Sequence, residues 1–415
     1  MSKKKNILFV HQNFPAQYKH LAPALHKNKD YEVRSLSMNN GSIQGIQHYK
    51  YSVAKANTPN LNRLAIEFET KIIRAEAAAK KCFEIKESGF NPDLIISHPG
   101  WGEVLFLKEV WPNTKILNYF EFYYNTKKSD VDFDLAETVR PDYGFELTTK
   151  LIARNAPFLS SFNQSDMMIS PTNFQKSTAP NEYKNKIEVV HEGIDTDVIK
   201  PNTDSFIDIS SGDKKIRLTR KDKIITFVNR NLEPYRGYHI FMRALPDVIK
   251  KHPDAYIIII GGDDVSYGAR PESGNYKDLY FNEIKDKLPI DHNIKFLGTV
   301  DYNVLLNFFS ITTVHIYLTY PFVLSWSMLE AMAMESLIIG SKTPPVEEVI
   351  KNNKNGILVD FFDYNKLSNL INKVLDNPES YKNLKKEARK TIINNYDLRT
   401  LCLPKQLDIV KKLIK

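Results

Sequence analysis

The sequence has few cysteines and no long apolar run. Its 415 residues include only Cys82 and Cys402, too few for the disulfide framework of a small secreted protein. Neither has a second cysteine or a histidine at the spacing of a metal site. No apolar run reaches the roughly 18 to 20 residues that cross a bilayer, and MSKKKNILFV at the start does not resemble a signal peptide. We therefore expect a reducing, cytoplasmic setting.

Two common nucleotide-binding motifs are also missing. Neither the GxGxxG fingerprint nor the GxxxxGK[ST] phosphate loop occurs, which argues against dehydrogenases and P-loop nucleoside triphosphatases. The net charge of +8 favours anionic partners such as phosphates, nucleic acid or the inner face of a membrane. The chain lacks the basic and aromatic motif of the common nucleic-acid-binding modules, so we expect no nucleic acid partner.

Short β-branched runs alternate with amphipathic stretches, as in parallel sheets covered by helices on both faces. The length exceeds that at which one hydrophobic core stops growing. We therefore predict two doubly wound, Rossmann-like α/β domains over residues 1–200 and 224–385, a linker over 201–223, and a helical tail over 386–415 that packs on the first domain. The expected strands are 6–10, 94–97, 115–122, 166–170, 187–191, 224–228, 256–262, 294–298, 314–318 and 337–341, and the clearest helices are 17–27 and 62–87.

The loop after the strand 224–228 carries Arg230 and Arg236. Ligands of open α/β sheets bind at the carboxyl ends of the strands, so this loop should border a binding site. Two arginines about six residues apart can hold a diphosphate through bidentate hydrogen bonds. Gly262, at the end of the strand 256–262, would let a ligand or a backbone segment approach closely.

An apolar stretch, TYPFVLSWSMLEAMAMES over residues 319–336, contains a single acid, Glu330. A carboxylate buried without a partner costs several kcal/mol or stays protonated. The helix in this stretch should begin near Pro321 or Ser325, where free backbone N–H groups favour an anion. We expect Glu330 to face the same crevice as the arginine loop and to accept hydrogen bonds from ligand hydroxyls.

The order of these segments resembles a known family. Together with the arginine loop, residues 261–262, 296–298 and 329–333 are similar to the carboxy-terminal domain of the retaining GT-B glycosyltransferases of family 4, the group 1 type. Residues 170–175 and 187–201 are similar to segments that precede the interdomain crossing of that family. The resemblance implies a GT-B fold in which two domains face a central cleft. It also implies retaining, metal-independent transfer from a nucleotide-diphosphate sugar to a glycan, lipid-linked or protein acceptor, with no cofactor.

The resemblance also implies roles for individual residues. It makes Arg230 and Arg236 the groups that bind the donor pyrophosphate and stabilise the leaving diphosphate, and Glu330 the group that binds the nucleotide ribose. His98 is the candidate to face the donor sugar or the reaction centre. Further donor-side candidates are Gly193, Asn229, Glu233, Gly262, Leu324 and Ser325, and the acceptor-side candidates are His11, Gln12 and Glu121.

Each candidate in the first domain also has a structural explanation. His98 could be satisfied by a turn carbonyl, and Glu121 could pair with a nearby lysine. His11 and Gln12 could cap or stabilise their loop. The pair at 191–192 could reach the cleft, but without a second histidine at helical spacing it predicts no zinc site.

Two positions depart from the family pattern. Phe322 stands eight residues before Glu330, where an acid that contacts the donor sugar is common, and Ala16 stands where a glycine of the acceptor loop is expected. The transferred sugar is therefore open, and a UDP-sugar is expected over a GDP-sugar.

Two other interpretations stay open. Asp132 and Asp134 form an Asp-x-Asp triplet that could hold Mg²⁺ or Mn²⁺ against a diphosphate, as in a single-domain GT-A transferase. The triplet lies in an acidic run and follows no clear apolar strand, so a solvated loop is the simpler expectation. Phe322 instead motivates a catalytically degenerate GT-B protein that binds a nucleotide sugar or glycan as a scaffold.

Overall fold

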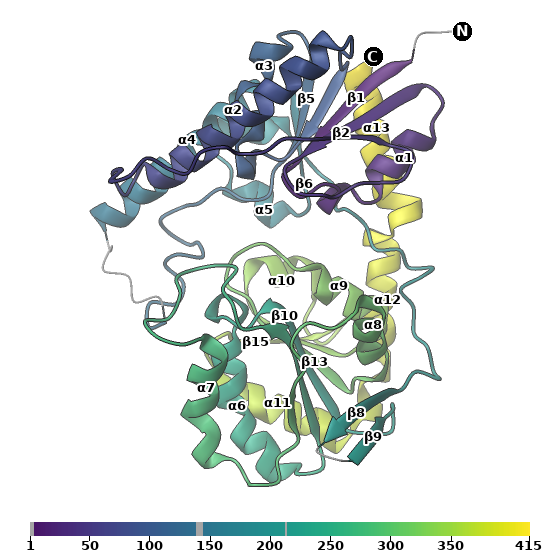
Figure 1. Cartoon of the computed structure of the whole chain (residues 1–415). Helices are drawn as coiled ribbons and strands as arrows, with labels where there is room; N and C mark the ends of the chain where they lie inside the picture. Colours follow the sequence, from purple (N-terminus) through teal and green to yellow (C-terminus); the bar gives the residue numbers. More distant parts are fainter. Residues whose placement is uncertain (1–3, 138–143, 212–213) are drawn as a thin grey trace. The chain divides into compact units, whose positions relative to one another are not determined.

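The computed structural model describes residues 4–137, 144–211 and 214–415, which form two compact α/β units (Figure 1). This agrees with the prediction of two doubly wound domains. In the part of the chain that is described, no helix combines the length and the apolar character that crossing a membrane requires. Unit 1 consists of Met1–Lys127, Arg140–Gly193 and Leu398–Lys415, and unit 2 consists of Lys128–Val139 and Ile194–Asp397.

Unit 1 is built on a seven-stranded parallel sheet of order β3-β2-β1-β4-β5-β6-β7. Ile7 and Phe9 pack with α1 and α13 on one face, and Leu8 and Val10 pack with α2 on the other. Burial on both faces explains why β1 is continuously apolar from Ile7 to Val10. The strands are β1 Lys5–Val10, β2 Tyr31–Ser37, β3 Gln47–Lys50, β4 Leu94–Ser97, β5 Lys115–Tyr119, β6 Met167–Ser170 and β7 Ile187–Val189, and the helices are α1 Leu21–Lys27, α2 Ile66–Glu87, α3 Leu107–Val110, α4 Phe145–Gln164, α5 Asn173–Thr178 and α13 Leu403–Ile414.

Unit 2 is built on a six-stranded parallel sheet of order β12-β11-β10-β13-β14-β15. Ile224 and Val228 pack with α8, α9 and α12, while the ring of Phe227 stacks on Phe241 of α6 with centroids 4.6 Å apart. The strands are β10 Ile224–Asn231, β11 Tyr256–Gly262, β12 Ile294–Phe296, β13 Val314–Tyr317, β14 Ile338–Ser341 and β15 Ile357–Val359, and the helices are α6 Tyr238–Lys251, α7 Tyr276–Ile284, α8 Tyr302–Ile311, α9 Trp326–Ala333, α10 Pro344–Val349, α11 Tyr364–Asp376 and α12 Lys382–Tyr396.

The strand order reverses once in each sheet. In unit 1 the reversal lies between β1 and β4, and in unit 2 it lies between β10 and β13. Open α/β sheets bind ligands at the carboxyl ends of the strands at such a point. His11 and His98 directly follow β1 and β4, and the loops with Arg236 and Ser325 follow β10 and β13. The topology therefore brings the predicted site residues of each unit to its own switch point.

Residues 201–223, predicted to be a linker, contain an antiparallel hairpin of β8 (Ile207–Ser211) and β9 (Lys214–Leu218) and belong to unit 2. Ile209 and Leu218 are buried in the core of that unit. Asp208 and Arg217 form an ion pair on the exposed side of the hairpin. Polar residues on this side interrupt the apolar pattern of both strands, so the sequence did not indicate them.

Three further strands were not predicted, namely β2, β3 and β15. Glu32 and Arg34 interrupt the apolar run of β2, where they pair with each other, and Arg34 also donates to the Tyr49 hydroxyl of β3. Most other elements differ from the predicted ranges only at their ends. β5 stops at Tyr119, and α1 and α2 begin at Leu21 and Ile66.

The helical tail is divided between the two units. The chain returns to unit 1 between Asp397 and Leu398, and α13 then packs with α1 and the core around β1, as predicted for the tail. The preceding helix α12 belongs to unit 2. There, the Arg389 guanidinium donates to the carbonyl of Ala333 at the end of α9 and to the carbonyl of Ile199. A cation at a helix C-terminus is stabilising, so α12 helps to hold α9 in place.

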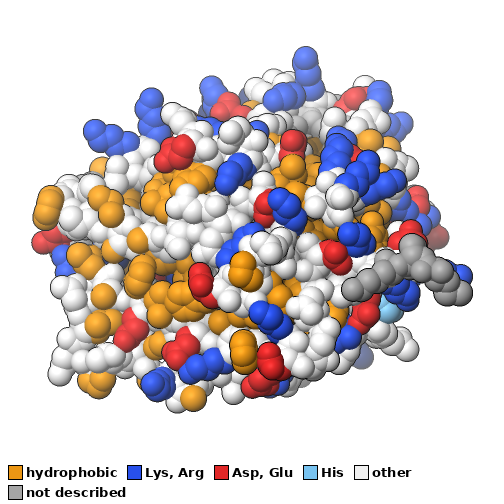
Figure 2. Space-filling view, turned by 90° about the horizontal axis from the view of Figure 1, so that it is seen from above, with side chains coloured by type: hydrophobic (Ala, Val, Ile, Leu, Met, Phe, Trp, Pro, Cys, Tyr) orange, Lys and Arg blue, Asp and Glu red, His pale blue; other side chains and the backbone are white. Residues whose placement is uncertain are grey.

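Among the residues that the structure describes, basic side chains do not gather into a single patch on the face drawn in Figure 2. Lysine and arginine side chains are interspersed there with acidic and hydrophobic ones. Several lysines pair within their own helix, as Lys80 does with Glu76 and Lys81 with Glu84. Such exposed pairs contribute little to stability, but they lower the local density of unpaired positive charge.

Candidate functional site

Arg236 is buried and fixed by hydrogen bonds to the neighbouring loop. Its side chain lies in the β10–α6 loop, and the residue is 7% exposed. Nη1 donates to the Thr319 hydroxyl at 3.0 Å and to the Val323 carbonyl at 2.9 Å. Both acceptors lie between β13 and α9, so the arginine joins the loops on either side of the switch point. Arg230, at the end of β10, is exposed.

Glu233 ties the same loop to the segment that follows β11. It is buried, and its Oε2 accepts the backbone N–H groups of Ser266 at 2.7 Å and Tyr267 at 3.1 Å. Burial raises the pKa of Glu233, and the two backbone donors offset part of that effect. A Cβ on Gly262 would lie 2.6 Å from Oδ1 of Asn231, so a larger residue there would displace the Asn231 side chain.

The start of α9 lies where the sequence predicted it. Ser325 is the N-cap residue, and its hydroxyl accepts the Ser327 N–H at 3.3 Å. The Ser325 N–H donates to the hydroxyl of Tyr317 at 2.8 Å. Leu324 is buried in the core of unit 2, and Asn229 is half-buried within β10.

Glu330 is more buried than we expected. It is 5% exposed, and its Oε1 accepts a hydrogen bond of 2.7 Å from the hydroxyl of Tyr302 at the start of α8. Most of this side chain is therefore shielded, and its carboxylate already has a partner within unit 2. Burial and the nearby Glu330 both raise the pKa of Tyr302, which keeps the phenol in its donating form. No motif marks Tyr302, because the pairing joins two helices through space.

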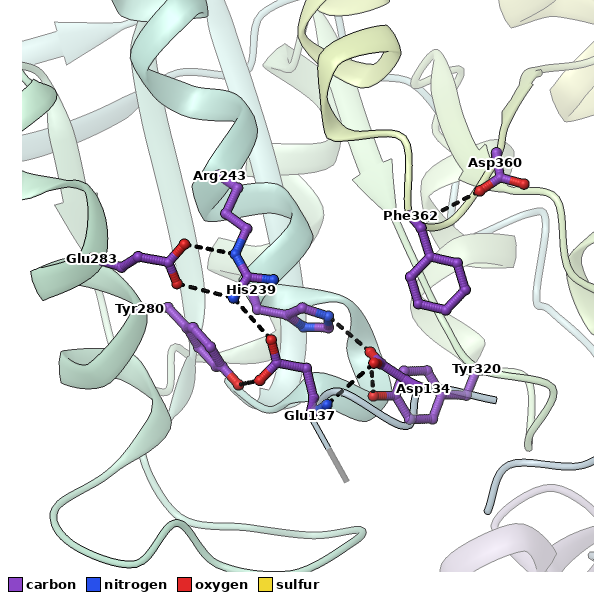
Figure 3. A network of polar contacts seen from close by, with 9 residues as sticks. All are labelled: Asp134, Glu137, His239, Arg243, Tyr280, Glu283, Tyr320, Asp360 and Phe362. Atoms are coloured by element: carbon purple, nitrogen blue, oxygen red, sulfur yellow. Dashed lines mark hydrogen bonds and ion pairs between the residues drawn. The ribbon is translucent and has the colours of Figure 1, made fainter. Parts of the chain in front are cut away.

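The Asp-x-Asp triplet is not a solvated loop, which corrects that expectation. Asp134 is 3% exposed, and its Oδ2 accepts from Nε2 of His239 at 3.0 Å and from the Tyr320 hydroxyl at 2.8 Å (Figure 3). Asp132 accepts the backbone N–H groups of Lys128 and Ser129. Both carboxylates are thus used within unit 2. Among the described residues, no group of three or more His, Cys, Asp or Glu side chains is arranged to hold a metal ion.

In unit 1, His98 follows β4 and is buried among other rings. Its Nδ1 accepts the Gly100 N–H at 3.0 Å, so a turn amide fixes the ring, where a turn carbonyl was the alternative. The ring stacks on Tyr119 at 5.4 Å. Since Nδ1 accepts a hydrogen bond, the proton of a neutral ring lies on Nε2, which is 3.6 Å from the carboxylate of Glu121. The Glu121 side chain is 39% exposed, so it is the accessible member of this pair.

His11 lies beside His98, with ring centroids 5.3 Å apart. Its Nδ1 accepts the Asn13 N–H at 2.9 Å, which is the loop-stabilising role that we considered. Gln12 is half-buried, and its backbone carbonyl accepts from Asn39 at 3.1 Å. Ala16 has a φ of 39°, a left-handed conformation that glycine adopts more readily.

A further polar cluster of unit 1 consists of Tyr119, His191 and Glu192, of which the sequence indicated only the pair at 191–192. Glu192 accepts a short hydrogen bond from Tyr119 and lies 3.4 Å from His191. A cavity of about 20 Å³, large enough for one water molecule, is lined by Tyr18, Tyr119 and Glu192 together with aliphatic side chains. Gly193 has a φ of 95°, and a Cβ there would lie 2.7 Å from the Cα of Leu398. The returning chain therefore accounts for this glycine.

Comparisons of the sequence identify two family matches. A family described as "Glycosyl transferase family 4 group" matches residues 29–199, and a family described as "Glycosyl transferases group 1" matches residues 209–391. The two matches follow each other along the chain and correspond to its two α/β halves.

Curated relatives match over part of the chain. Spore coat protein SA of Bacillus subtilis is 28% identical over 217 residues, which are 51% of this chain and 55% of that protein. The GDP-mannose-dependent monoacylated alpha-(1-6)-phosphatidylinositol monomannoside mannosyltransferase of Corynebacterium glutamicum is 26% identical over 200 residues, 46% of this chain and 47% of that protein. The chain thus spans about half the length of these relatives.

Solved structures are similar over the whole chain. Sucrose-phosphate synthase from Thermosynechococcus elongatus has a TM-score of 0.72 at 16% identity and covers 99% of both chains. HepE of Anabaena in complex with UDP has a TM-score of 0.64 at 15% identity, covering 98% of this chain and 99% of that chain. At these identities the likeness establishes the fold.

The buried His11 predicts a pH-dependent stability. Burial, and then the neighbouring His98, lower the pKa of His11 to about 3. Unfolded histidine titrates near 6.5, so between about pH 6.5 and 3 the unfolded state binds more protons. Acidification through this range should therefore destabilise the protein, by up to about 1.4 kcal/mol per pH unit from this group.

Substitution of His11 tests this dependence. His11→Asn keeps an acceptor for the Asn13 N–H and removes the titrating ring, so urea unfolding of this variant should depend less on pH between about 7 and 4.5. The control is His26→Asn, at an exposed position in α1, which should follow the wild type. Equal pH profiles for all three proteins would show that His11 does not titrate in this way.

Proposed function

We propose that this chain, which has the GT-B fold and matches the family 4 and group 1 glycosyltransferase families over residues 29–199 and 209–391, is a glycosyltransferase that transfers a sugar, with retention, from a nucleotide-diphosphate sugar to a glycan, lipid-linked or protein acceptor. The observation that carries this proposal is the fixed Arg236 guanidinium at the switch point of unit 2. A positive group held in place before the substrate arrives needs little reorganisation when negative charge develops on a leaving diphosphate.

The donor contacts follow from the loops around that point. Arg236 and the exposed Arg230 supply positive charge, and the backbone N–H groups at the start of α9 supply hydrogen bonds to phosphate oxygens. Glu330 is the proposed acceptor for the ribose hydroxyls. Its oxygen now accepts from Tyr302, so a bound ribose would share or replace that hydrogen bond.

Recognition of the sugar should differ from the family pattern at Phe322. The ring is buried against Tyr267 and Tyr235, with centroid distances of 4.8 and 5.5 Å. An apolar wall thus takes the place of the expected acid, and the sugar hydroxyls must find other partners. A UDP-sugar is the preferred donor in this proposal, and the complexes of HepE with UDP and with UDP-glucose support it by analogy. The Corynebacterium relative is named for GDP-mannose, so GDP-sugars belong in any test.

The acceptor is assigned to unit 1, where His11, His98 and Glu121 follow the strand ends at its switch point. The Gln12 side chain is a further candidate contact. We also propose a cytoplasmic setting, at the inner face of the membrane if the acceptor is lipid-linked. The small number of cysteines, both of them buried, and the net charge of +8 support this setting.

The transfer is proposed to be independent of metal ions. Arg236 and the start of α9 can neutralise the diphosphate, and Asp132 and Asp134 are already used in hydrogen bonds within unit 2. Release of nucleotide from a sugar nucleotide should therefore continue at an unchanged rate in excess EDTA. A loss of activity that added Mg²⁺ or Mn²⁺ restores would contradict this part of the proposal.

Arg236→Ala tests the donor site directly. Removal of a group that stabilises developing charge should lower kcat/KM for the sugar nucleotide by about 10²-fold or more. Arg236→Lys keeps the charge but cannot reproduce the geometry of the guanidinium, so it should recover only part of the loss.

The control for this experiment is Arg217→Ala, at an exposed arginine on the β8–β9 hairpin, which should behave as the wild type. Thermal unfolding of each variant checks that the fold is retained. Wild-type kinetics in a folded Arg236→Ala variant would refute the assignment. Tight binding of nucleotide without turnover on any acceptor would instead favour the scaffold function.

A further inference from the structure

Unit 2 contains a ten-residue segment that comes from between two elements of unit 1. Residues Lys128–Glu137 follow β5 and precede α4 in the sequence, yet they group with unit 2. Val131 is buried, and the ring of Phe133 packs against Tyr320 and Phe362 with centroid distances of 5.2 and 5.1 Å. Ordering each residue of a chain costs about 1 to 2 kcal/mol of conformational entropy. The contacts that hold this segment on unit 2 must offset that cost.

Two buried carboxylates of the segment accept hydrogen bonds from two tyrosines. Asp130 is 1% exposed, and its Oδ2 accepts the Tyr235 hydroxyl at 2.8 Å. Asp134 accepts the Tyr320 hydroxyl at 2.8 Å and Nε2 of His239 at 3.0 Å (Figure 3). Burial alone would raise the pKa of Asp134, but the hydrogen bonds from His239 and Tyr320 outweigh it, so the pKa is lowered and the carboxylate stays charged.

These tyrosines belong to the two loops that form the proposed donor site. Tyr235 directly precedes Arg236 in the β10–α6 loop, and Tyr320 directly follows Thr319, which binds Arg236. The Tyr320 N–H donates to the Tyr235 carbonyl at 3.0 Å, and the two rings lie 4.7 Å apart. The two carboxylates therefore bind the loops at residues that directly adjoin Arg236 and its partner Thr319.

The segment has a third carboxylate, Glu137, whose partners lie on helices and not on the two loops. Glu137 accepts from Nη2 of Arg243 on α6 at 2.8 Å and from the hydroxyl of Tyr280 on α7 at 2.6 Å. Figure 3 shows it on the side of the network toward Arg243 and Glu283, away from Tyr320. Glu137 thus anchors the segment to α6 and α7 only, whereas Asp130 reaches the loops through Tyr235, and Asp134 reaches them through Tyr320 in addition to its contact with His239 of α6.

We propose that Asp130 and Asp134 are positioning residues of the donor site, which hold Tyr235 and Tyr320 and thereby set the spacing between Arg236 and the start of α9. The inference rests on the proposed function, because it assumes that these loops bind the diphosphate. Positioning of this kind matters because a displacement of about 1 Å at a reacting group can cost about 10²-fold in rate. It explains why an acidic run from another part of the chain is buried here, where an apolar segment would pack at lower cost.

Paired substitutions separate positioning from simple anchoring. Asp134→Asn keeps the shape of the side chain but weakens its hydrogen bonds to Tyr320 and His239. Glu137→Gln is the matched control, because it makes the same chemical change on the same segment and weakens only the contacts to α6 and α7. Tyr320→Phe removes the other partner of the Asp134 contact while the ring stays in place.

Both UDP and GDP are titrated by calorimetry, and release of UDP from UDP-glucose is measured for each folded variant. We expect Asp134→Asn and Tyr320→Phe to weaken binding of the nucleoside diphosphate, or to lower kcat/KM, by roughly 10- to 100-fold. The double variant should lose little more than either single variant, because both remove the same contact. Glu137→Gln should lower the melting temperature and leave the nucleotide constants at wild-type values.

The outcomes distinguish this inference from the proposed function. If Arg236→Ala abolishes donor use while Asp134→Asn binds and releases nucleotide as the wild type does, the positioning role is refuted and the donor site stands. Equal losses in Asp134→Asn and Glu137→Gln would reduce the segment to a general anchor and also refute the role. Unchanged kinetics in Arg236→Ala would overturn the donor site itself.

Discussion

A buried arginine is the interaction on which the unit 2 site depends. The Arg236 guanidinium must be compensated, because a buried charge without partners costs several kcal/mol. The Thr319 hydroxyl and the Val323 carbonyl supply partners from the loop across the switch point. The loops after β10 and β13 are thereby locked together, and the charge of the arginine is held beside the start of α9. Glu233 extends the arrangement to the segment after β11 through two backbone N–H groups.

The locked loops are supported from distant parts of the chain. The hydrogen bond from Tyr320 to Asp134 spans 186 residues of sequence, and that from Tyr235 to Asp130 spans 105. On the other side, Arg389 of α12 holds the last carbonyl of α9. A site assembled from so many segments forms only when unit 2 is complete, including residues 128–137 from the connection between β5 and α4. Rigid support of this kind is what a preorganised electrostatic site requires.

The sequence predicted the architecture, and it predicted where the loops of the proposed donor site lie along the chain, because both depend on local signals. Apolar strands followed by turns gave the parallel sheets, and the carboxyl ends of those strands located Arg236 and the start of α9. Partners that meet through space could not be predicted in this way. Tyr302 beside Glu330 and His239 beside Asp134 carry no motif, and the polar face of the β8–β9 hairpin concealed its two buried residues. Phe322 was predicted to depart from the family pattern. Its packing against Tyr235 and Tyr267 could not be predicted, because both tyrosines are distant from it in the sequence.

The central claim is that unit 2 binds a nucleotide-diphosphate sugar. Thermal unfolding in the presence of a panel of UDP-, GDP-, ADP- and dTDP-sugars, with the matching nucleoside monophosphates as controls, tests it most directly. A ligand present at about 100 times its dissociation constant stabilises the folded protein by about 2.7 kcal/mol, so at least one sugar nucleotide should raise the melting temperature well beyond its monophosphate. If no sugar nucleotide in the panel stabilises the protein, the account of the donor site is wrong.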